Sequence, residues 1–199
     1  PEIEPGENGD IIRYQLKNDA HWSDGSELNS DDVIFSFKSF LNPHAQLSYL
    51  EDYFHFIDSV VALSSKSFLV YCNTSASDNL FRSGDFEILP SHIFDPDSVL
   101  LNYSFKELRK YNPELGIDSA LLNFGSFLQE LRILNDSSRI SGTGAYYVDE
   151  ISFNQYIILK KKKNWWGENH VDKSFFFQSY PDEIEFKIFM DNLPATMSF

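Results

Sequence analysis

The sequence predicts a mixed α+β fold, because strand-like and helix-like patterns both occur along it without alternating regularly. Ile12, Tyr14 and Leu16 repeat every second residue, which is the period of a strand with one buried face. An apolar stripe with helical spacing follows between residues 117 and 131, and further strand-like runs come after it. This order lacks the strand-helix alternation of a doubly wound sheet.

The first predicted helix follows a tight turn. Residues 23–26 read Ser-Asp-Gly-Ser, and Asp-Gly supplies the positive φ that such a turn needs. Asn29 or Ser30 can then cap a helix, and Asn42-Pro43 ends it. Next, residues 57–63 and 68–72 are β-rich and flank a polar tetrapeptide, which predicts a hairpin.

The chain is expected to divide near Pro90, after a polar surface connection at residues 73–85. Pro90 rigidifies the backbone, and a new helical pattern starts soon after it. We therefore expect a small α+β sub-domain over residues 1–89 and a partial main lobe over residues 90–199.

The second half begins with helices and ends with strands. Ser104 and Glu107 fit a capping box, and Pro113 ends that element. The longest predicted helix carries an apolar stripe formed by Ile117, Leu121, Phe124, Leu128 and Leu131. Strand-like runs then lie at residues 145–151, 156–160 and 184–190. In the last run Ile184, Phe186, Ile188 and Met190 alternate with other residues.

Composition excludes several classes of protein. With 199 residues and 42% hydrophobic side chains, the chain can bury a core without disulfides. Its net charge of −14 disfavours a surface built for nucleic acid or anionic lipid. No apolar run approaches the roughly 18–20 residues of a membrane span. Cys72 stands alone and can form no internal disulfide.

The sequence contains no recognisable active site, and we predict neither an enzyme nor a cofactor. Asp31 and Asp32 are adjacent at the start of a predicted helix. Carboxylates there are stabilised by the positive end of the helix dipole, so we interpret the two acids as a helix start and not as a catalytic pair. The histidines lack metal-ligand spacing and are expected in surface or packing roles; they are His21, His44, His55, His92 and His170. The glycines of Ser141–Gly144 fit neither a nucleophile elbow nor a phosphate-binding loop.

Lys160–Lys163 followed by Trp165-Trp166 could suggest basic charge beside stacking aromatics, as in a nucleic-acid site. The overall charge of −14 argues against that interpretation, because its field repels a polyanion. We expect instead a solvated strand end followed by a buried aromatic corner.

Several segments in order resemble the extracellular solute-binding proteins of the oligopeptide/dipeptide ABC-importer family (family 5). Residues 12–16 and 22–37 resemble its strand, Trp-Ser-Asp-Gly turn and helix opening with Asp-Val. Residues 88–93 are similar to its Leu-Pro-Lys-His segment. Residues 142–146, 156–160, 164–167 and 182–186 resemble its GTGPY, strand, N-x-Y-W-G and D-E-I-x-F series. Ala145 and Trp165 stand where the family has proline and often tyrosine, and residues 102–139 match nothing in it.

The resemblance implies a partial type II periplasmic-binding-protein-like fold. Family members are more than twice as long and close two lobes on a ligand, so the chain is expected to be an N-terminal fragment whose second lobe is absent. Structural roles are expected for the motif residues Trp22, Asp24, Gly25, Asp32, Gly142, Gly144, Tyr146, Trp165, Trp166 and Gly167. By position, Tyr49 corresponds to a tyrosine that the family offers to peptide, with Tyr53 as second choice. Either can equally be an ordinary half-buried tyrosine.

The implied function is substrate binding for an ABC importer: capture of oligopeptides or dipeptides outside the cytoplasm and delivery to an inner-membrane permease by lobe closure. We expect no binding to nucleic acid. We expect contact with a membrane only through a lipid anchor outside this sequence. Two alternatives stay open. The same fold can bind a nickel complex or an oligosaccharide, or it can be the sensory domain of a regulator.

Overall fold

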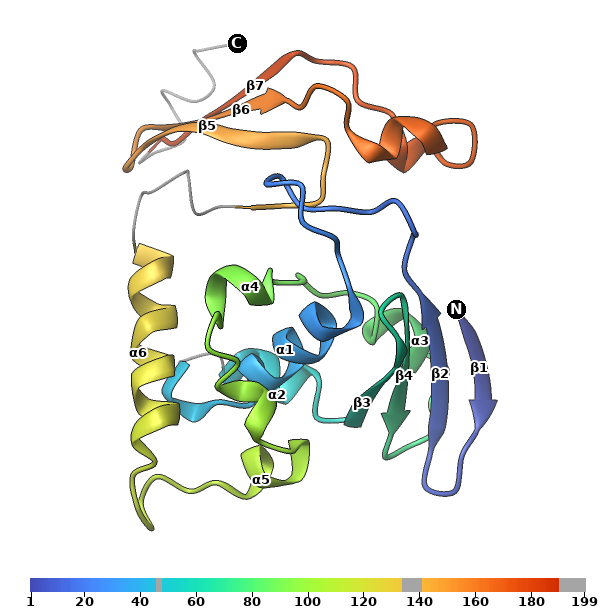
Figure 1. The fold of residues 1–199 in the computed structure, drawn as a ribbon, viewed down its shortest axis with the longest axis vertical. Helices are drawn as coiled ribbons and strands as arrows, with labels where there is room; N and C mark the ends of the chain where they lie inside the picture. The colour runs from blue at the N-terminus through green and yellow to red at the C-terminus, as the bar shows by residue number, and fades with distance from the viewer. Residues whose placement is uncertain (46–47, 134–140, 190–199) are drawn as a thin grey trace. The chain divides into compact units, whose positions relative to one another are not determined.

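The computed structural model describes residues 1–45, 48–133 and 141–189, without the side chains of residues 48, 49, 51 and 130–133. The chain divides into two compact units. Unit 1 comprises Pro1–Asn18 and Leu28–Ile133, and unit 2 comprises Asp19–Glu27 and Leu134–Phe199. This division does not coincide with the boundary predicted at Pro90, which stays a prediction about sub-domains of the family fold. Figure 1 shows the elements of both units along the chain.

Unit 1 contains an antiparallel four-stranded sheet. Its strands are β1 (Glu2–Pro5), β2 (Asp10–Gln15), β3 (Ile57–Ser64) and β4 (Ser67–Cys72). Their order is β1-β2-β4-β3, so β1 and β3 are the two edge strands. Ile12 lies opposite Val70, and both are buried against the core. The strand predicted around residues 12–16 and the hairpin predicted between residues 57 and 72 are therefore both confirmed.

The helix α1 (Ser30–Phe40) begins with a complete capping box. The side-chain oxygen of Asn29 accepts hydrogen bonds from the backbone N–H groups of Asp31 and Asp32, at 2.8 and 3.2 Å. The Asp32 carboxylate accepts in return from the backbone N–H of Asn29, at 3.0 Å. The two acids thus mark a helix start, as predicted, because they satisfy and complement its free N–H groups.

Asp32 also connects α1 to the next part of the chain. Its second carboxylate oxygen accepts from both the N–H and the hydroxyl of Ser91, at 2.9 and 2.7 Å. Ser91 opens the short helix α4 (Ser91–Phe94). Ser36, one turn along α1, accepts from the N–H of Leu89 at 2.8 Å. The N-terminal half of α1 therefore fixes the segment around Pro90 with buried polar contacts.

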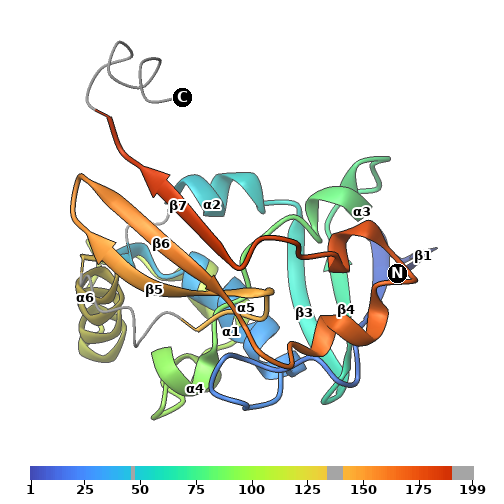
Figure 2. The ribbon, with the colours of Figure 1, turned by 90° about the horizontal axis from the view of Figure 1, so that it is seen from above.

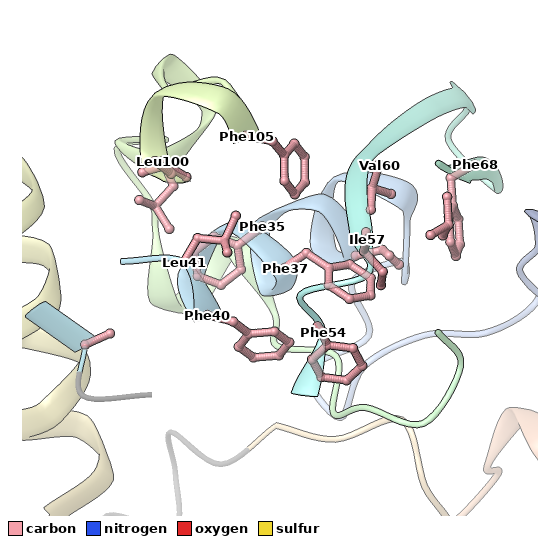
Figure 3. Packing of buried hydrophobic residues seen from close by; sticks show 14 of the residues in the cluster. Phe35, Phe37, Phe40, Leu41, Phe54, Ile57, Val60, Phe68, Leu100 and Phe105 are labelled. Atoms are coloured by element: carbon pink, nitrogen blue, oxygen red, sulfur yellow. The ribbon is translucent and has the colours of Figure 1, made fainter. Parts of the chain in front are cut away.

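The core of unit 1 is rich in phenylalanine. The ring of Phe37 meets Phe40 and Phe54 edge-on, with centroids 5.9 and 5.5 Å apart. Phe35 meets Phe124 of the long helix in the same way, at 6.0 Å. Figure 3 shows these rings of α1 beside Ile57 and Val60 of β3. Edge-to-face packing suits the quadrupoles of aromatic rings, so phenylalanine fills the space between helix and sheet.

The remaining helices of unit 1 are short except for one. They are η1 (Pro43–Ala45), α2 (Ser48–Tyr53), α3 (Asn79–Arg82), η2 (Leu100–Asn102), α5 (Phe105–Lys110) and α6 (Ser119–Ile133). The capping box predicted for Ser104 and Glu107 is present at the start of α5. The polar stretch predicted as a surface connection contains α3 and the buried Asn79. Its side chain donates to Asp10 and to the Thr74 carbonyl, which anchors the stretch.

The helix α6 starts later than predicted. The Asp118 carboxylate accepts from the N–H groups of Ala120 and Leu121, so it closes the first turn. Ile117 therefore lies before the helix and is 69% exposed, and its predicted place in the apolar stripe is wrong. Leu121, Phe124 and Leu128 are buried as expected, while the side chain of Leu131 lies outside the description.

Unit 2 contains a three-stranded antiparallel sheet of β5 (Tyr146–Ser152), β6 (Tyr156–Lys161) and β7 (Glu183–Lys187). Figure 2 shows these strands from above. The helices η4 (Trp166–His170) and η5 (Phe175–Phe177) lie between β6 and β7. Phe186 and Ile188 are about half exposed, at 53% and 47%, so the alternation there does not define a buried face. Met190 lies outside the described residues.

No helix in the described parts of the chain is long and apolar enough to cross a membrane.

Replacing Asp32 should destabilise unit 1. Asp32→Ala removes a capping box and leaves the donors of Ser91 without their buried acceptor, which together cost about 2–4 kcal/mol. Asp31→Ala, at the exposed neighbouring position, should cost less than about 1 kcal/mol. The measurement is the urea dependence of thiol labelling at Cys72, which is buried in unit 1. Equal midpoints for the two variants would contradict this assignment.

Candidate functional site

Tyr53, the second tyrosine suggested by the sequence, lies in a polar-aromatic cluster on unit 1. We define this arginine cluster by Tyr53, Phe56, Asp78, Arg82 and Asp85. The Arg82 guanidinium lies 5.0 Å from the Tyr53 ring centre and 4.3 Å from that of Phe56. It also donates to the Tyr53 carbonyl and pairs with Asp78 at 3.7 Å. The cation thereby lies close enough to two aromatic rings for cation–π attraction.

The hydroxyl of Tyr53 makes one side-chain contact within the arginine cluster. It lies 3.5 Å from an oxygen of Asp85, a long hydrogen bond that competes poorly with other partners. The residue is 38% exposed. Together these groups can offer a ring face, a hydroxyl and a carboxylate to a polar ligand. Tyr49 lies in α2, and its side chain lies outside the description, so its predicted ligand contact stays a prediction.

The second candidate region is in unit 2, where the structure assembles motif residues that are far apart in the sequence. Trp22, Gly25, Trp165 and Trp166 line one pocket of about 280 Å³, together with Lys162 and neighbouring residues. We call this the tryptophan pocket. Trp22 and Trp165 are buried, and the rings of Trp165 and Trp166 pack at 5.7 Å. The predicted aromatic corner is therefore present.

Backbone carbonyls of the Gly142–Gly144 segment hold the tryptophan pocket together. The Thr143 carbonyl accepts from the indole N–H groups of both Trp165 and Trp166, at 2.8 and 2.9 Å. The Gly142 carbonyl accepts from Ser23 at 3.0 Å and from Lys162 at 2.6 Å. Indole N–H groups usually find such partners when buried, so these tryptophans fix an irregular loop.

The other motif residues make local contacts. The Asp24 carboxylate accepts from the N–H and hydroxyl of Ser26, and Gly25 has a φ of +86°. These are the contacts of the predicted turn. The Tyr146 hydroxyl donates to the Pro181 carbonyl at 2.9 Å. A Cβ at Gly167 would lie 2.3 Å from the Trp165 ring, whereas one at Gly142 or Gly144 would meet nothing within 4 Å.

A hydrogen-bonded pair that the sequence did not reveal lies beside the tryptophan pocket, where the His170 ring packs against Trp166. His170 is buried, and its Nε2 lies 2.8 and 2.9 Å from the two oxygens of Asp19. Lys173 approaches the other ring nitrogen at 3.1 Å. The hydrogen bond from His170 lowers the pKa of the Asp19 carboxyl below its ordinary value. This pair ties the Asp19–Glu27 segment to the rest of unit 2.

Lys162 is the strongly perturbed cation of this region. Burial lowers its pKa to about 8, because the charged ammonium loses water. Its hydrogen bond to the Gly142 carbonyl does not replace that hydration fully. Among the residues that the structure describes, no group of three histidine, cysteine or acidic side chains is placed to hold a metal ion.

Arg82 and the pairing of Asp19 with His170 were not singled out from the sequence. Lys162 was considered only within the basic run Lys160–Lys163, which was expected to be a solvated strand end, whereas Lys162 is half-buried. The bond between Asp19 and His170 joins residues 151 positions apart, and no local pattern indicates such a partner. Arg82 lies in a stretch that reads as a polar connection. Only the proximity of Lys162 to Trp165-Trp166 in the sequence hinted at a shared environment.

A sequence model of the bacterial extracellular solute-binding proteins, family 5 Middle, matches residues 2–199. The chain belongs to this family. Family 5 proteins are binding proteins of transport systems, in agreement with the resemblance seen in the motifs. No curated protein sequence matches the chain.

Solved structures of distant sequence show the same fold as this family 5 chain. The oligopeptide-binding protein of Thermus thermophilus, solved with a pentapeptide, gives a TM-score of 0.64 at 14% identity, covering 99% of this chain and 32% of that one. NikZ of Campylobacter jejuni, solved with Ni(L-His), gives a TM-score of 0.60 at 21% identity, and the match covers 99% of this chain and 31% of NikZ. An oligopeptide-binding protein of Thermotoga maritima, bound to mannohexaose, gives 0.59 at 19% identity, covering 98% and 30%.

These similarities confirm the mixed fold class and its likeness to part of a periplasmic binding protein. The chain spans about a third of the length of the solved proteins it matches.

Two glycines of the family motif should respond differently to alanine. Gly167→Ala places a methyl group inside the Trp165 ring contact, which should lower the stability of unit 2 by about 1–3 kcal/mol. Gly144→Ala points a methyl group into open space and should leave stability unchanged within about 0.5 kcal/mol. Tryptophan fluorescence during thermal unfolding measures both. A Gly144→Ala variant as unstable as Gly167→Ala would contradict the steric explanation.

Lys162 should make unit 2 more stable as the pH rises from about 8 toward 10.5. Its pKa is lower in the folded chain than its ordinary value of 10.5, so the unfolded chain binds more protons in that window. An NMR titration of the lysine side chains should show one signal with a midpoint near 8. This signal should vanish in Lys162→Met, and the pH-dependent gain in stability should shrink. A midpoint above 10 would contradict the buried environment.

Proposed function

We propose that this chain is part of the substrate-binding component of an ABC importer. The observation that carries the proposal is the family 5 match over residues 2–199. The component captures oligopeptides or dipeptides outside the cytoplasm, in the periplasm or on a lipid anchor, and delivers them to an inner-membrane permease. It performs no catalysis and needs no cofactor.

Transport by such a protein depends on a change between open and closed states. A ligand favours closure only by the difference between its affinities for the two states. We propose that residues 1–89 and 90–199 are sub-domains of the lobe that supplies one wall of the ligand site. A second lobe, outside this sequence, supplies the other wall.

We place the ligand contact of unit 1 at Tyr53 and Tyr49. The arginine cluster supports this assignment, because it presents an exposed ring, a weakly bonded hydroxyl and the Asp85 carboxylate on one surface. Such groups suit the main-chain amides and the amino terminus of a peptide. Arg82 restrains Tyr53 through a contact with its ring and a hydrogen bond to its backbone carbonyl.

A second candidate function keeps the fold and changes the solute. Relatives of similar fold were solved with Ni(L-His) and with mannohexaose as well as with a pentapeptide. Fold alone does not select among these ligands. The parent protein of this chain could therefore carry a nickel complex or an oligosaccharide.

Calorimetry on the parent protein decides between the two functions. A mixture of di- to pentapeptides should release heat, whereas Ni(L-His) and mannohexaose should release none. Tyr53→Ala should weaken peptide binding by about tenfold, since it removes a ring contact and a hydrogen bond. Tyr53→Phe should lose only the part of the binding free energy that the hydroxyl contributes. Tyr180→Ala, at a position that is 80% exposed in unit 2, is the control. Heat with nickel complexes or sugars and none with peptides would refute the peptide assignment.

A further inference from the structure

Unit 1 contains a large open groove that the proposed transport function does not use. Its volume is about 780 Å³, and it lies between α1, β3 and α5. Ile34, Val60 and Phe105 line its apolar part. Figure 3 shows Phe105 on α5 and Val60 on β3 beside one another. The volume is in the range of sites for small organic molecules.

The groove is elongated, because it follows one strand edge. Five consecutive residues, Asp58–Ala62, line it, although successive side chains of a strand point to opposite faces. A cavity that touches all five must therefore run along the edge of β3. This strand ends the sheet order in the part of the chain that the structure describes. Five residues of strand span about 13 Å between their first and last Cα atoms.

The opposite wall of the groove is cationic. Lys106, Arg109 and Lys110 all line it, and their spacing of three and four residues places them on one face of α5. Lys38 lines it as well, and Asp58 is the only acid among the lining residues. The chain as a whole carries a charge of −14. Four cations around one cavity therefore make the electrostatic potential there more positive than the net charge of the chain would suggest.

Lys38 is a buried cation without a carboxylate partner among the described residues. Its side chain is 6% exposed. Its ammonium donates to the carbonyls of Leu100 and Leu101, at 3.2 and 3.4 Å, and lies 5.8 Å from the Phe105 ring centre. Two neutral acceptors do not compensate for a buried charge as an anion does. Burial accordingly lowers the pKa of Lys38, while the charges of Asp95, Asp31 and Glu107 oppose that shift.

We propose that this groove binds an organic carboxylate with a linear apolar body, such as a medium-chain fatty acid. The carboxylate meets the cationic wall, and the aliphatic chain lies along the β3 edge against Ile34, Val60 and Phe105. An acidic peptide matches the charge but not the apolar lining, because its backbone amides would lose water without full compensation. The groove lies wholly within unit 1, so it is separate from the tryptophan pocket.

Titration of this chain with sodium decanoate, below its micelle concentration, tests the proposal. Calorimetry should show saturable binding that weakens with added salt. Affinity should rise by about threefold for each methylene from octanoate to decanoate. Decanol and decyltrimethylammonium, which share the tail but lack the anion, should bind at least about tenfold more weakly. Binding of an acidic peptide without binding of decanoate would overturn the proposal, as would equal binding of all three ten-carbon ligands.

Variants that remove positive charge test whether the ligand binds in this groove. Lys106→Ser with Lys110→Ser should weaken decanoate binding by about fivefold. Arg13→Ser with Lys17→Ser removes the same charge from exposed positions outside the groove and should have no such effect. Ile34→Trp should block the groove by filling it. Thermal unfolding of each variant shows whether its fold is kept. If a folded groove variant and the control bind decanoate equally, the proposed site is wrong.

Discussion

The buried carboxylate of Asp32 is the interaction on which unit 1 depends. One oxygen closes the first turn of α1, and the other accepts two hydrogen bonds from Ser91. α1 supplies Phe35, Phe37 and Phe40 to the core, so its position sets the space that the other rings fill. A carboxylate is suited to this place because it accepts several hydrogen bonds and lies at the positive end of a helix.

The family motif residues of unit 2 contact one another within that unit, in line with the structural role predicted for them. Trp165 and Trp166 share one carbonyl acceptor at Thr143, while Gly167 leaves room for the Trp165 ring. None of the strand residues of β5, β6 and β7 in the described sheet is buried. The aromatic corner instead contains the buried Trp22 and Trp165, and the sheet adds backbone hydrogen bonds. Rings and loop carbonyls together hold a part of the fold that a small sheet alone would hold weakly.

Features with local causes could be predicted from the sequence, and those with distant causes could not. The capping box at Ser104 depends on residues three positions apart, so its pattern was visible. For the first helix the sequence offered Asn29 or Ser30 as the cap, and the structure selects Asn29 with a capping box. The family resemblance of the Trp22 and Trp165 segments was also visible. Ile117 was misplaced because Asp118 caps α6. The strand predicted from the alternation around Phe186 is present as β7, but the alternation alone did not reveal that Phe186 is 53% exposed. Nothing in the sequence places Lys38 beside α5 or Asp19 beside His170, since tertiary packing creates both environments.

The Asp19–Glu27 segment belongs to unit 2 but is synthesised long before the rest of that unit. Ser23 bonds to Gly142 across 119 positions, and Asp19 bonds to His170 across 151. At about 5–20 residues per second, translation reaches those partners roughly 6–30 s later. Trp22 is only 3% exposed in the folded chain, yet on the ribosome it has no completed unit to enter. Its segment can therefore reach its folded contacts only after residues 142–170 have been synthesised.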